Sequence, residues 1–311
     1  MNTLWGIDLG GTKIEGLVIR PGKKPETVCR LRIPTEAQKG YEHILQQIGK
    51  LVGMMSNQTG SYPRILGIGT PGTIDPHSGL LKNSNTACLN DKPIKEDLER
   101  IMGVPVRVAN DANCFALAEA KLGVVQKVLP KAEVVFGVIM GTGVGGGVVV
   151  NGRIVQGGQG IAGEWGHNVL DLEGDECYCG KQGCVEKVIS GPAIEKYWKT
   201  LAGETNGLTF KDAVMRPEAE YSEATKQTLE RLVTMFGKAI SVVINVIDPE
   251  VIVIGGGLGN IAQLYSRGHE EAKKHVFNNR LETLFLRPEL GDSAGVFGAA
   301  MLTEEELSKA S

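Results

Sequence analysis

The sequence has no excess of positive charge, few aromatic residues and no long apolar run. Its 311 residues carry 33 lysines and arginines against 36 aspartates and glutamates, a net charge of −3. A nucleic-acid-binding surface usually needs a basic face, so we expect no nucleic-acid partner. No apolar run reaches the roughly 18 residues of a membrane helix, and the first residue leads into a predicted strand rather than a signal peptide. We therefore expect a cytoplasmic protein that binds no membrane.

Disulfides are not expected either. The six cysteines, in a cytosolic chain of this size, are typical of thiols or metal ligands. Glycine, by contrast, is abundant: there are 42 glycines, where about 7% of a chain is usual. Many of them lie in tight runs, which favours phosphate-binding loops. The length favours two domains, each with its own core.

Strand-like segments alternate with amphipathic helices, which indicates an α/β protein. Strands are predicted over 4–10, 14–19, 65–70, 104–109, 134–140, 148–150 and 250–254. Helices are predicted over 41–55, 112–122, 223–246 and 294–306. In the first of these helices the apolar residues have the spacing of an amphipathic helix, which places them on one face.

One segment of the sequence repeats. Residues 5–19, WGIDLGGTKIEGLVI, match residues 136–150, FGVIMGTGVGGGVVV, at a constant offset of 131 without a gap. Two glycine-rich hairpins can resemble each other by chance. The alternative is a duplicated domain, in which each half opens with a strand–turn–strand that offers backbone N–H groups to phosphate. Two such ribonuclease H-like halves, facing each other across a cleft, would form an actin-like or hexokinase-like ATPase fold.

Three glycine runs are candidates for nucleotide binding. The first turn comprises Gly10, Gly11, Thr12 and Lys13 and follows Asp8; the second comprises Gly141, Thr142 and Gly143; the third comprises Gly255, Gly256 and Gly257. A turn without side chains lets successive N–H groups converge on an anion, although a single such turn is also consistent with a tight hairpin. Asp8 is placed to hold Mg²⁺, through water. The third run either lets an adenosine approach the backbone or caps and packs a helix.

A carboxylate opens the predicted helix after residue 109. Asn110 and Asp111 lie between a buried strand and that helix, where α/β proteins hold catalytic groups. Asp is also a good helix N-cap, so this position alone does not decide its role. Phosphoryl transfer to a hydroxyl needs one positioned carboxylate to accept the proton. Together with the glycine turns, Asp111 is the candidate for that base.

A fourth cluster has the composition of a metal site. His167 is followed by Cys177, Cys179 and Cys184 within a short, glycine-rich segment. One imidazole and three thiolates suit a closed, tetrahedral zinc site, which is structural rather than catalytic. The alternative is a chance cluster of reduced thiols. Two carboxylates, Glu164 and Glu186, flank these ligands and are either surface residues or groups that the zinc loops position.

Together these motifs resemble the ROK family of repressors and sugar kinases, over essentially the whole chain. The resemblance is carried by GIDLGGTK (6–13), GIGTPGTID (67–75), NDAN (110–113), GTGVGGG (141–147), GEWGH (163–167), CYCGKQGCVE (177–186) and DPEVIVIGGG (248–257). It implies two α/β domains, over 1–120 plus 294–311 and over 121–293, with the C-terminal helix returning to the first. It also implies ATP, Mg²⁺ and a structural Zn²⁺ as cofactors, and we expect a homodimer.

The resemblance also implies roles for individual residues. Asp111 is the expected general base. The expected sugar-binding residues are Asn110, Glu164, His167 and Glu186, with Gly72 and Asn85 lining the same pocket. The chain departs from many hexose-specific members after Asn85, where it reads Thr86-Ala87-Cys88-Leu89. That departure bears on the sugar preference rather than on the chemistry.

The expected reaction is ATP-dependent phosphorylation of a free hexose, fructose, mannose or glucose, at its 6-hydroxyl. The chain resembles the fructokinase/mannokinase type most, in the segments Leu81–Asn85 and Glu164–His167. Trp165, beside Glu164, is expected to fill the space that an acetamido group would need, or else to point into the core and leave that space open. The alternative is an N-acetylglucosamine or N-acetylmannosamine kinase. A non-catalytic, sugar-responsive ROK regulator is a second alternative. A DNA-binding repressor would carry a winged helix before the first glycine turn, for which Asp8 leaves no room.

Overall fold

The computed structural model describes residues 3–22 and 25–309 of the chain. The chain divides into two compact units. The first unit comprises Met1–Val128, Gly147–Ala162 and Leu290–Ser311, and the second comprises Leu129–Gly146 and Gly163–Glu289.

The segment Gly147–Ala162 joins the first unit, whereas the sequence-based division assigns it to the second domain. Close backbone approaches explain this grouping. A Cβ atom on Gly147 would lie 2.6 Å from the Ala112 carbonyl oxygen, and one on Gly160 would lie 2.9 Å from the Ile74 carbonyl oxygen. These two glycines let the segment lie directly against the backbone of the first unit.

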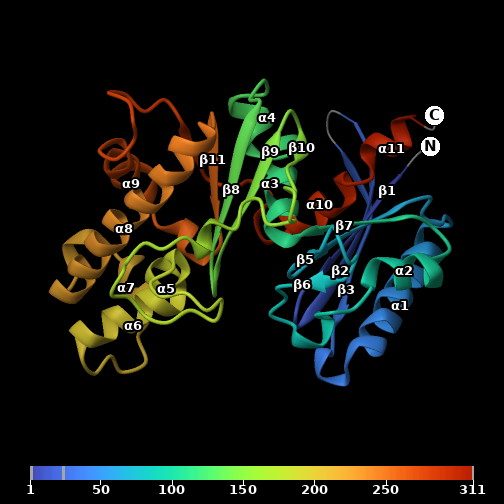
Figure 1. Ribbon diagram of the computed structural model, residues 1–311, viewed down its shortest axis with the longest axis horizontal. Coiled ribbons are helices and arrows are strands. Elements are labelled where there is room, and N and C mark those ends of the chain that lie inside the picture. The colour runs from blue at the N-terminus through green and yellow to red at the C-terminus, as the bar shows by residue number, and fades with distance from the viewer. Residues whose placement is uncertain (1–2, 23–24, 310–311) are drawn as a thin grey trace. The chain divides into compact units, whose positions relative to one another are not determined.

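A five-stranded mixed sheet forms the centre of the first unit (Figure 1). Its strands are β1 (Leu4–Leu9), β2 (Lys13–Arg20), β3 (Glu26–Pro34), β4 (Leu66–Thr70) and β7 (Val106–Asn110), in the order β3-β2-β1-β4-β7. Strands β1, β2 and β3 pair antiparallel, whereas β1, β4 and β7 pair parallel. The three parallel strands therefore end at one edge of the sheet.

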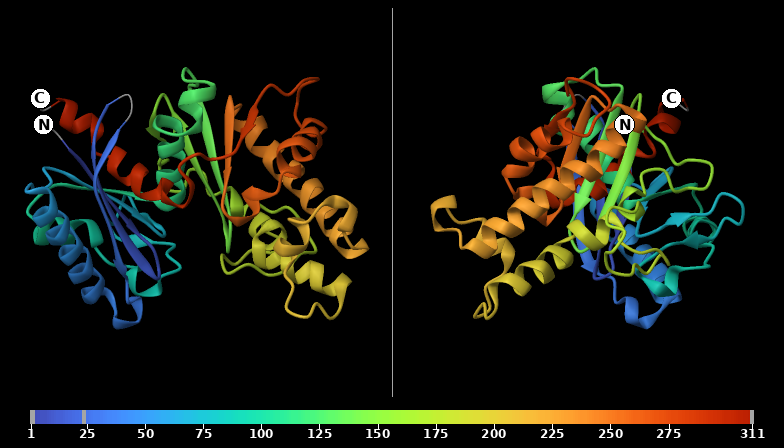
Figure 2. Two further views of the ribbon diagram at one scale, coloured as in Figure 1. Left: turned by 180° about the vertical axis from the view of Figure 1, so that it is seen from behind. Right: turned by 60° about the vertical axis from the view of Figure 1, so that its left-hand side comes forward.

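Helices cover both faces of this sheet. Helices α1 (Tyr41–Thr59) and α2 (Ile94–Met102) lie side by side and bury the apolar core that includes Trp5, Ile7 and Leu9 (Figure 1). Helices α3 (Asp111–Lys121) and α10 (Ala294–Met301) pack on the other face, along which α10 runs (Figure 2). Gly6 and Gly67 allow the close approach of α10, because a Cβ on either would lie within 2.5 Å of its backbone.

The second sheet repeats the strand order of the first. It consists of β10 (Arg153–Ile154), β9 (Val144–Val150), β8 (Val134–Met140), β11 (Val251–Gly255) and β12 (Leu284–Leu286), in that order. Strands β8, β11 and β12 pair parallel, as β1, β4 and β7 do. Two sheets with the same order and directions are not expected of a chance likeness between hairpins. The predicted duplication and the α/β class are therefore confirmed.

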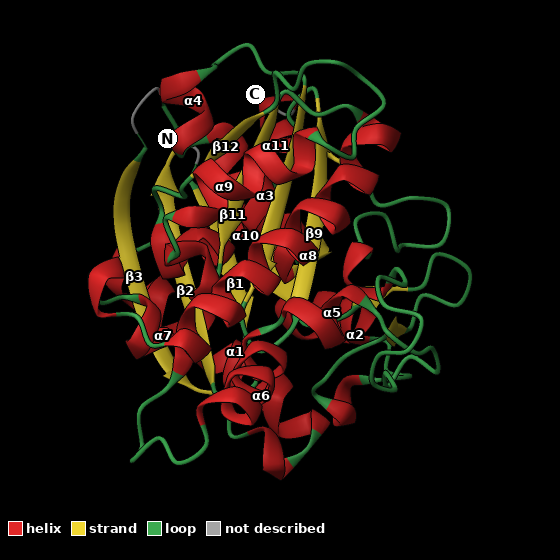
Figure 3. Cartoon of the chain, turned by 90° about the vertical axis from the view of Figure 1, so that its left-hand side faces the viewer, coloured by secondary structure: helices red, strands yellow, loops and turns green. Residues whose placement is uncertain are grey.

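Helices α8 (Glu223–Ile247) and α9 (Gln263–Lys273) pack against each other and lie in front of the strands of the second unit in Figure 3. The Phe285 ring of β12 contacts both helices, with Phe236 of α8 at 6.0 Å and His269 of α9 at 5.0 Å between ring centroids. The other helices are α4 (Val124–Val128), α5 (Val185–Ile189), α6 (Gly191–Ala202), α7 (Phe210–Val214) and α11 (Glu304–Lys309). No described helix is long and apolar enough to cross a membrane.

The structure departs from the predicted elements in two ways. The helix predicted over 294–306 is two helices, because the chain leaves α10 at Leu302 and the hydroxyl of buried Thr303 bonds back to the Ala300 carbonyl. The described elements for which no range was predicted include β3, β10, β12, α2, the short helices α4 to α7, α9 and the short hairpin of β5 (Thr73–Ile74) and β6 (Leu81–Lys82). Strand β3 alternates buried and exposed residues at the edge of its sheet, so it lacks a continuous apolar run.

Candidate active site

Two carboxylates lie at the edge where the parallel strands of the first unit end. Asp8 pairs with Gly69 across β1 and β4, and Thr70 pairs with Asn110 across β4 and β7. Asp111 follows Asn110 directly and begins α3. This edge is where open α/β sheets bind their ligands. The structure thus brings together the residues predicted to bind Mg²⁺ and to act as general base.

The helix cap at this edge is Asn110 rather than Asp111. The Asn110 Oδ1 atom accepts a 2.8 Å hydrogen bond from the Ala112 amide, which defines Asn110 as the N-cap of α3. Its Nδ2 donates to the Gly72 carbonyl at 3.3 Å. Asp111 is the first residue of the helix, and its Oδ1 shares the Ala112 amide at 2.7 Å. Because Asn110 already caps the helix, capping alone does not explain why an aspartate is present at position 111.

The electrostatics of this edge favour a cation. Partial burial, followed by the charges of Asp111 and Glu15, raises the pKa of Asp8 to about 6. Burial also raises the pKa of Asp111, while hydrogen bonds to its carboxylate oppose the rise. Asp111 itself is exposed to solvent. The negative charges of Asp8 and Asp111 repel each other, and a bound cation would offset that repulsion.

The edge also holds a buried hydroxyl that the sequence did not single out. Thr70 is fully buried at the end of β4, and its Oγ1 has no hydrogen-bond partner among the described residues. Buried polar groups usually have a protein or water partner, so this oxygen is available to a ligand or its water. The residue pattern gave no signal for it, because a threonine at a strand end is common.

Helix α10 sets the position of the Asp8 side chain. Asp8 shares its sheet face with Gly6, and both lie against this helix. A Cβ atom on Gly295 would lie 2.9 Å from Asp8 Oδ2. On the same face, Asp8 pairs with Glu15 and Glu15 with Arg32, which form a row across three strands. The Arg32 guanidinium forms an ion pair with Glu15 at 2.7 Å, and its positive charge partly opposes the rise in the pKa of Asp8.

The first glycine turn is closed and anchored by its own backbone. The Gly10 amide bonds the Lys13 carbonyl at 3.0 Å. Buried Thr35, which the sequence reading missed, donates its hydroxyl to the Gly10 carbonyl at 2.6 Å. A Cβ on Gly11 would lie 3.6 Å from the Thr86 hydroxyl, so the segment after exposed Asn85 borders this turn.

The backbone conformation at position 72 explains why this residue is a glycine. Its φ of +85° is in the region that favours glycine, and a Cβ there would lie 2.4 Å from the Lys82 carbonyl oxygen. Its own carbonyl accepts the Asn110 side chain. Gly72 therefore connects the short β5–β6 hairpin, which leads to Asn85, with the cap of α3. The first unit thus gathers Gly72 and Asn110 at the same edge as Asp111.

The second glycine turn resembles the first in its closure but not in its surroundings. The Gly141 amide bonds the Gly143 carbonyl at 2.9 Å, and the Gly141 carbonyl accepts the Gly191 amide at 2.8 Å. Glu186 Oε2 accepts the Val144 amide at 2.9 Å. Glu186 was expected to contact sugar, and the structure shows that one of its oxygens also holds the backbone next to the second turn.

The third glycine run lies against the second turn. Gly256 has a φ of +81°, and a Cβ on it would lie within 2.7 Å of the backbone of Met140, the residue before Gly141. A Cβ on Gly257 would meet nothing within 4 Å. The second unit therefore brings 141–143 and 255–257 together, and leaves the backbone at Gly257 open.

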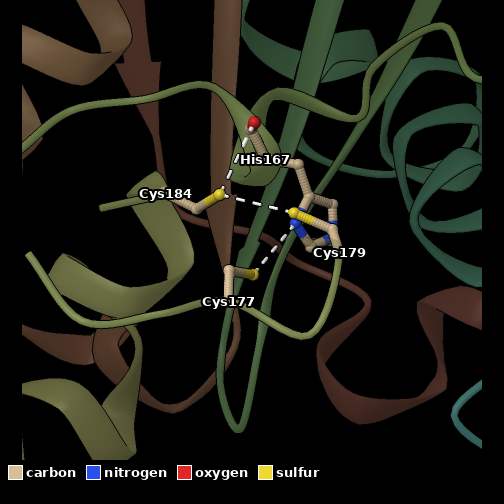
Figure 4. Close-up of side chains that lie close together, drawn as sticks. All are labelled: His167, Cys177, Cys179 and Cys184. Carbon is tan, nitrogen blue, oxygen red and sulfur yellow. Dashed lines mark hydrogen bonds between the residues drawn. The ribbon is translucent and has the colours of Figure 1, made fainter. Parts of the chain in front are cut away.

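The four predicted metal ligands converge at one point of the second unit (Figure 4). Their donor atoms all lie within 4.8 Å of one another, with Cys179 and Cys184 sulfurs 3.6 Å apart and His167 Nδ1 3.6 Å from the Cys177 sulfur. Ligands on a tetrahedral zinc stand about 3.5–3.8 Å apart, given Zn–S of about 2.3 Å. The donor set and its spacing are thus compatible with one structural zinc.

The chain was also compared with known proteins. A sequence model of the ROK family matches residues 4–306. The chain belongs to the ROK family. It is 34% identical to an N-acetyl-D-glucosamine kinase of Histophilus somni over 309 residues, which cover 96% of this chain and 98% of the relative. An N-acetyl-D-glucosamine kinase of Pasteurella multocida is 34% identical over the same shares of both chains.

Solved structures of this family share the fold. A ROK hexokinase of Thermus thermophilus is 29% identical and superposes with a TM-score of 0.84 over 99% of each chain. A ROK glucokinase of Streptomyces griseus, solved with glucose and AMPPNP, is 26% identical and has a TM-score of 0.78 over 98% of this ROK chain and 100% of its own. The actin-like, hexokinase-like fold expected from the repeat is therefore confirmed.

Trp165 does not occupy the place expected of it. Its side chain is 4% exposed, its Nε1 donates to the Gly145 carbonyl at 2.9 Å, and its ring meets Phe136 edge to face at 6.0 Å. The indole is therefore part of the core beneath β9. Contrary to the expectation from the sequence, it gives no physical reason to exclude an acetamido group in favour of an unsubstituted hexose.

Proposed function

We propose that this ROK chain is an ATP-dependent kinase that phosphorylates the 6-hydroxyl of a free sugar. The observation that carries the proposal is the edge of the first sheet, where Asp8 and Asp111 lie near enough for their charges to interact and where the strand of Asp8 leads into a closed glycine turn. Fold alone does not establish an activity, but these carboxylates are the groups that phosphoryl transfer to a hydroxyl needs. The similarity to sugar kinases over nearly the whole chain supports the same reading.

In this mechanism Asp111 accepts the proton of the sugar hydroxyl as it attacks the γ-phosphorus of ATP. The carboxylate is available for this, because Asn110 caps the helix and because Asp111 is accessible to solvent. Its raised pKa brings it nearer to the operating pH, which favours general-base catalysis. Asn110, Glu164, His167 and Glu186 would offer hydrogen bonds to the other hydroxyls, and the segments at Gly72 and Asn85 would line the sugar.

Nucleotide binding is assigned to the glycine runs. Gly10, Gly11, Thr12 and Lys13 and the second turn, Gly141, Thr142 and Gly143, offer backbone N–H groups to the phosphates. Gly255, Gly256 and Gly257 lie against the second turn and would receive the adenosine at the open backbone of Gly257. Asp8 would hold Mg²⁺, through water, with the Thr70 hydroxyl near the same edge. The cation neutralises charge on the phosphates when bound.

A structural Zn²⁺ would be held by His167, Cys177, Cys179 and Cys184. Thiolates and imidazole favour zinc over Mg²⁺ or Ca²⁺. The zinc segment continues into α5, where Glu186 reaches the Val144 amide beside the second glycine turn. Zinc would thereby hold both the candidate sugar ligands His167 and Glu186 and the backbone next to a candidate phosphate site.

N-acetylglucosamine is the first candidate for the sugar. Relatives that are 34% identical over 96% of the chain are named for that substrate, and the buried Trp165 leaves no argument against the acetamido group. An unsubstituted hexose is the second candidate. It is favoured by the fructokinase-like segment Leu81–Asn85 and by the similarity to a ROK hexokinase and a glucokinase.

The deciding experiment measures kcat/KM for N-acetylglucosamine, N-acetylmannosamine, glucose, mannose and fructose by coupled ADP release. An advantage of tenfold or more for one class identifies the substrate, because a site that hydrogen-bonds a substituent rejects sugars lacking it. No turnover with any of the five would contradict the kinase assignment and favour a sugar-responsive regulator. Light scattering checks the proposed homodimer, and cell fractionation the proposed cytoplasmic location.

The general base is tested by Asp111→Asn. The amide keeps the size of the side chain but cannot take the proton, so we expect turnover to fall by about 10²–10⁴ while sugar binding, measured by calorimetry, stays nearly unchanged. Turnover within a few fold of the wild-type value would return Asp111 to a purely structural role at the start of α3.

A further inference from the structure

An exposed tyrosine contacts the zinc-ligand histidine from outside the cluster. The Tyr178 side chain is 77% exposed, yet its hydroxyl lies 3.1 Å from His167 Nε2, and the two rings meet edge to face at 5.2 Å. Tyr178 sits between Cys177 and Cys179 on a turn that is closed by a 2.7 Å bond from the Cys177 amide to the Lys181 carbonyl. An exposed ring contributes little to a core, so its contact with His167 needs another explanation.

The direction of this hydrogen bond follows from the metal site. His167 Nδ1 is the nitrogen that faces the thiols, and a nitrogen that binds a metal carries no proton. With zinc bound at Nδ1, Nε2 would carry the proton and donate it, which is the usual arrangement for a metal-ligating histidine. The Tyr178 oxygen is then the acceptor, and its own proton remains free to be donated.

Two carboxylates, Glu186 and Glu164, lie near enough to the Tyr178 hydroxyl for their charges to act on it. The tyrosine hydroxyl thus accepts from an imidazole N–H and stands near carboxylate acceptors. A sugar hydroxyl can likewise accept one hydrogen bond and donate another. It could therefore accept from His167 and donate to one of the two glutamates, as the tyrosine hydroxyl could.

We propose that the Tyr178 hydroxyl is an internal placeholder for a sugar hydroxyl on His167 Nε2, and that the ring turns away when the sugar binds. This inference rests on the proposed function, in which His167 and Glu186 bind the sugar. Because the ring is exposed, few contacts oppose its rotation. The main cost of turning it away is the loss of its hydrogen bond to His167. The free protein is then partly in a form that cannot bind sugar, which raises the apparent Kd.

The matched test is Tyr178→Phe in the zinc-loaded protein, with Tyr62→Phe as the control. Tyr62 is also exposed and also donates its hydroxyl, to the Met102 carbonyl at 3.1 Å, but it belongs to the first unit, far along the chain from the zinc ligands. Removing the Tyr178 hydroxyl leaves no bond to break. We expect the Kd of the preferred sugar, by calorimetry, to fall about two- to tenfold, the equivalent of one ordinary hydrogen bond.

Zinc content and the Tyr62→Phe variant should match wild type in this experiment. In histidine-labelled protein without sugar, the His167 Nε2–H resonance should shift in Tyr178→Phe and stay in place in Tyr62→Phe. An unshifted resonance, or a sugar Kd that is unchanged or higher in Tyr178→Phe, overturns the placeholder while the kinase assignment stands. If wild-type protein binds none of the five sugars, the proposed function fails and the placeholder fails with it.

Discussion

The substitution Gly295→Ala is expected to move the Asp8 carboxylate while changing the stability of the protein very little. It therefore tests whether the position of Asp8 matters for activity. Gly295 lies in the first turn of that helix and has no positive φ. A Cβ atom there would lie 2.9 Å from Asp8 Oδ2 and 3.1 Å from Asp8 Cγ. No backbone atom is among these closest contacts, so the fold can accept the methyl group if the carboxylate moves.

The size of both effects follows from this geometry. Alanine in a helix is about 0.5–1 kcal/mol more favourable than glycine, and moving one half-buried carboxylate offsets part of that gain. We expect the free energy of unfolding to change by less than about 1 kcal/mol. Real Cβ contacts of 3.4 Å or more require Asp8 to move by about half an ångström. A misplacement of about 1 Å at a reacting centre can cost 10²-fold, so we expect kcat/KM for MgATP to fall about tenfold.

The assay pairs urea unfolding with coupled ADP release, and the control is Gly53→Ala. Gly53 lies inside helix α1, where a Cβ would meet nothing within 4 Å. We expect this control to gain up to about 1 kcal/mol of stability and to keep full activity. If Gly295→Ala keeps kcat/KM within twofold of wild type while remaining folded, then either Asp8 does not need its observed position or it has no part in phosphoryl transfer.

Three further outcomes are expected. Protein purified without chelator should hold about one equivalent of zinc by elemental analysis, and Cys177→Ser should lower both stability and sugar affinity; no zinc and three freely titratable thiols would contradict the site. A proton and a cation compete for Asp8, whose pKa is raised to about 6 by burial and by Asp111, so kcat/KM for MgATP should fall as the pH drops through 6, and a flat profile to pH 5 would oppose this reading. Gly67→Ala places a Cβ 1.8 Å from the Ala299 carbonyl oxygen, so urea unfolding should show a loss of about 3 kcal/mol or more, and an unchanged midpoint would refute the close approach of α10.

The fold could be predicted largely because its signals are local. The two glycine hairpins, the buried strands β4, β7 and β11 and the long helix α8 each show their period within one segment. Strands β3 and β12 carry no such signal, since β3 is half exposed and β12 has only three residues. Their pairing depends on neighbouring strands that are already in place. Tertiary contacts, and not the local sequence pattern, therefore determine that β3 and β12 form strands.

The candidate site was less predictable than the fold, because side-chain environment is not encoded in spacing. The four metal ligands lie within one short stretch of sequence, so their convergence could be expected. Trp165 lies between two predicted sugar ligands, yet it turns into the core because its indole fits beside Phe136. Thr35 and Thr70 come from strand ends with no distinguishing motif. Only their burial and bonding in the structure single them out.

The duplicated halves share a backbone but divide the chemistry between them. At the repeat offset of 131, Asp8 corresponds to Ile139 and Gly10 to Gly141. Each turn is closed by a hydrogen bond from the amide of its first glycine, so both halves keep a closed turn, but only the first half has a carboxylate at this strand position. The second half has a carboxylate of different origin: Glu186 reaches the Val144 amide from the zinc segment. Because Glu186 lies two residues after the predicted zinc ligand Cys184, we expect zinc binding to order the backbone beside the second turn through this bond, whereas the proposed cation on Asp8 would act at the first.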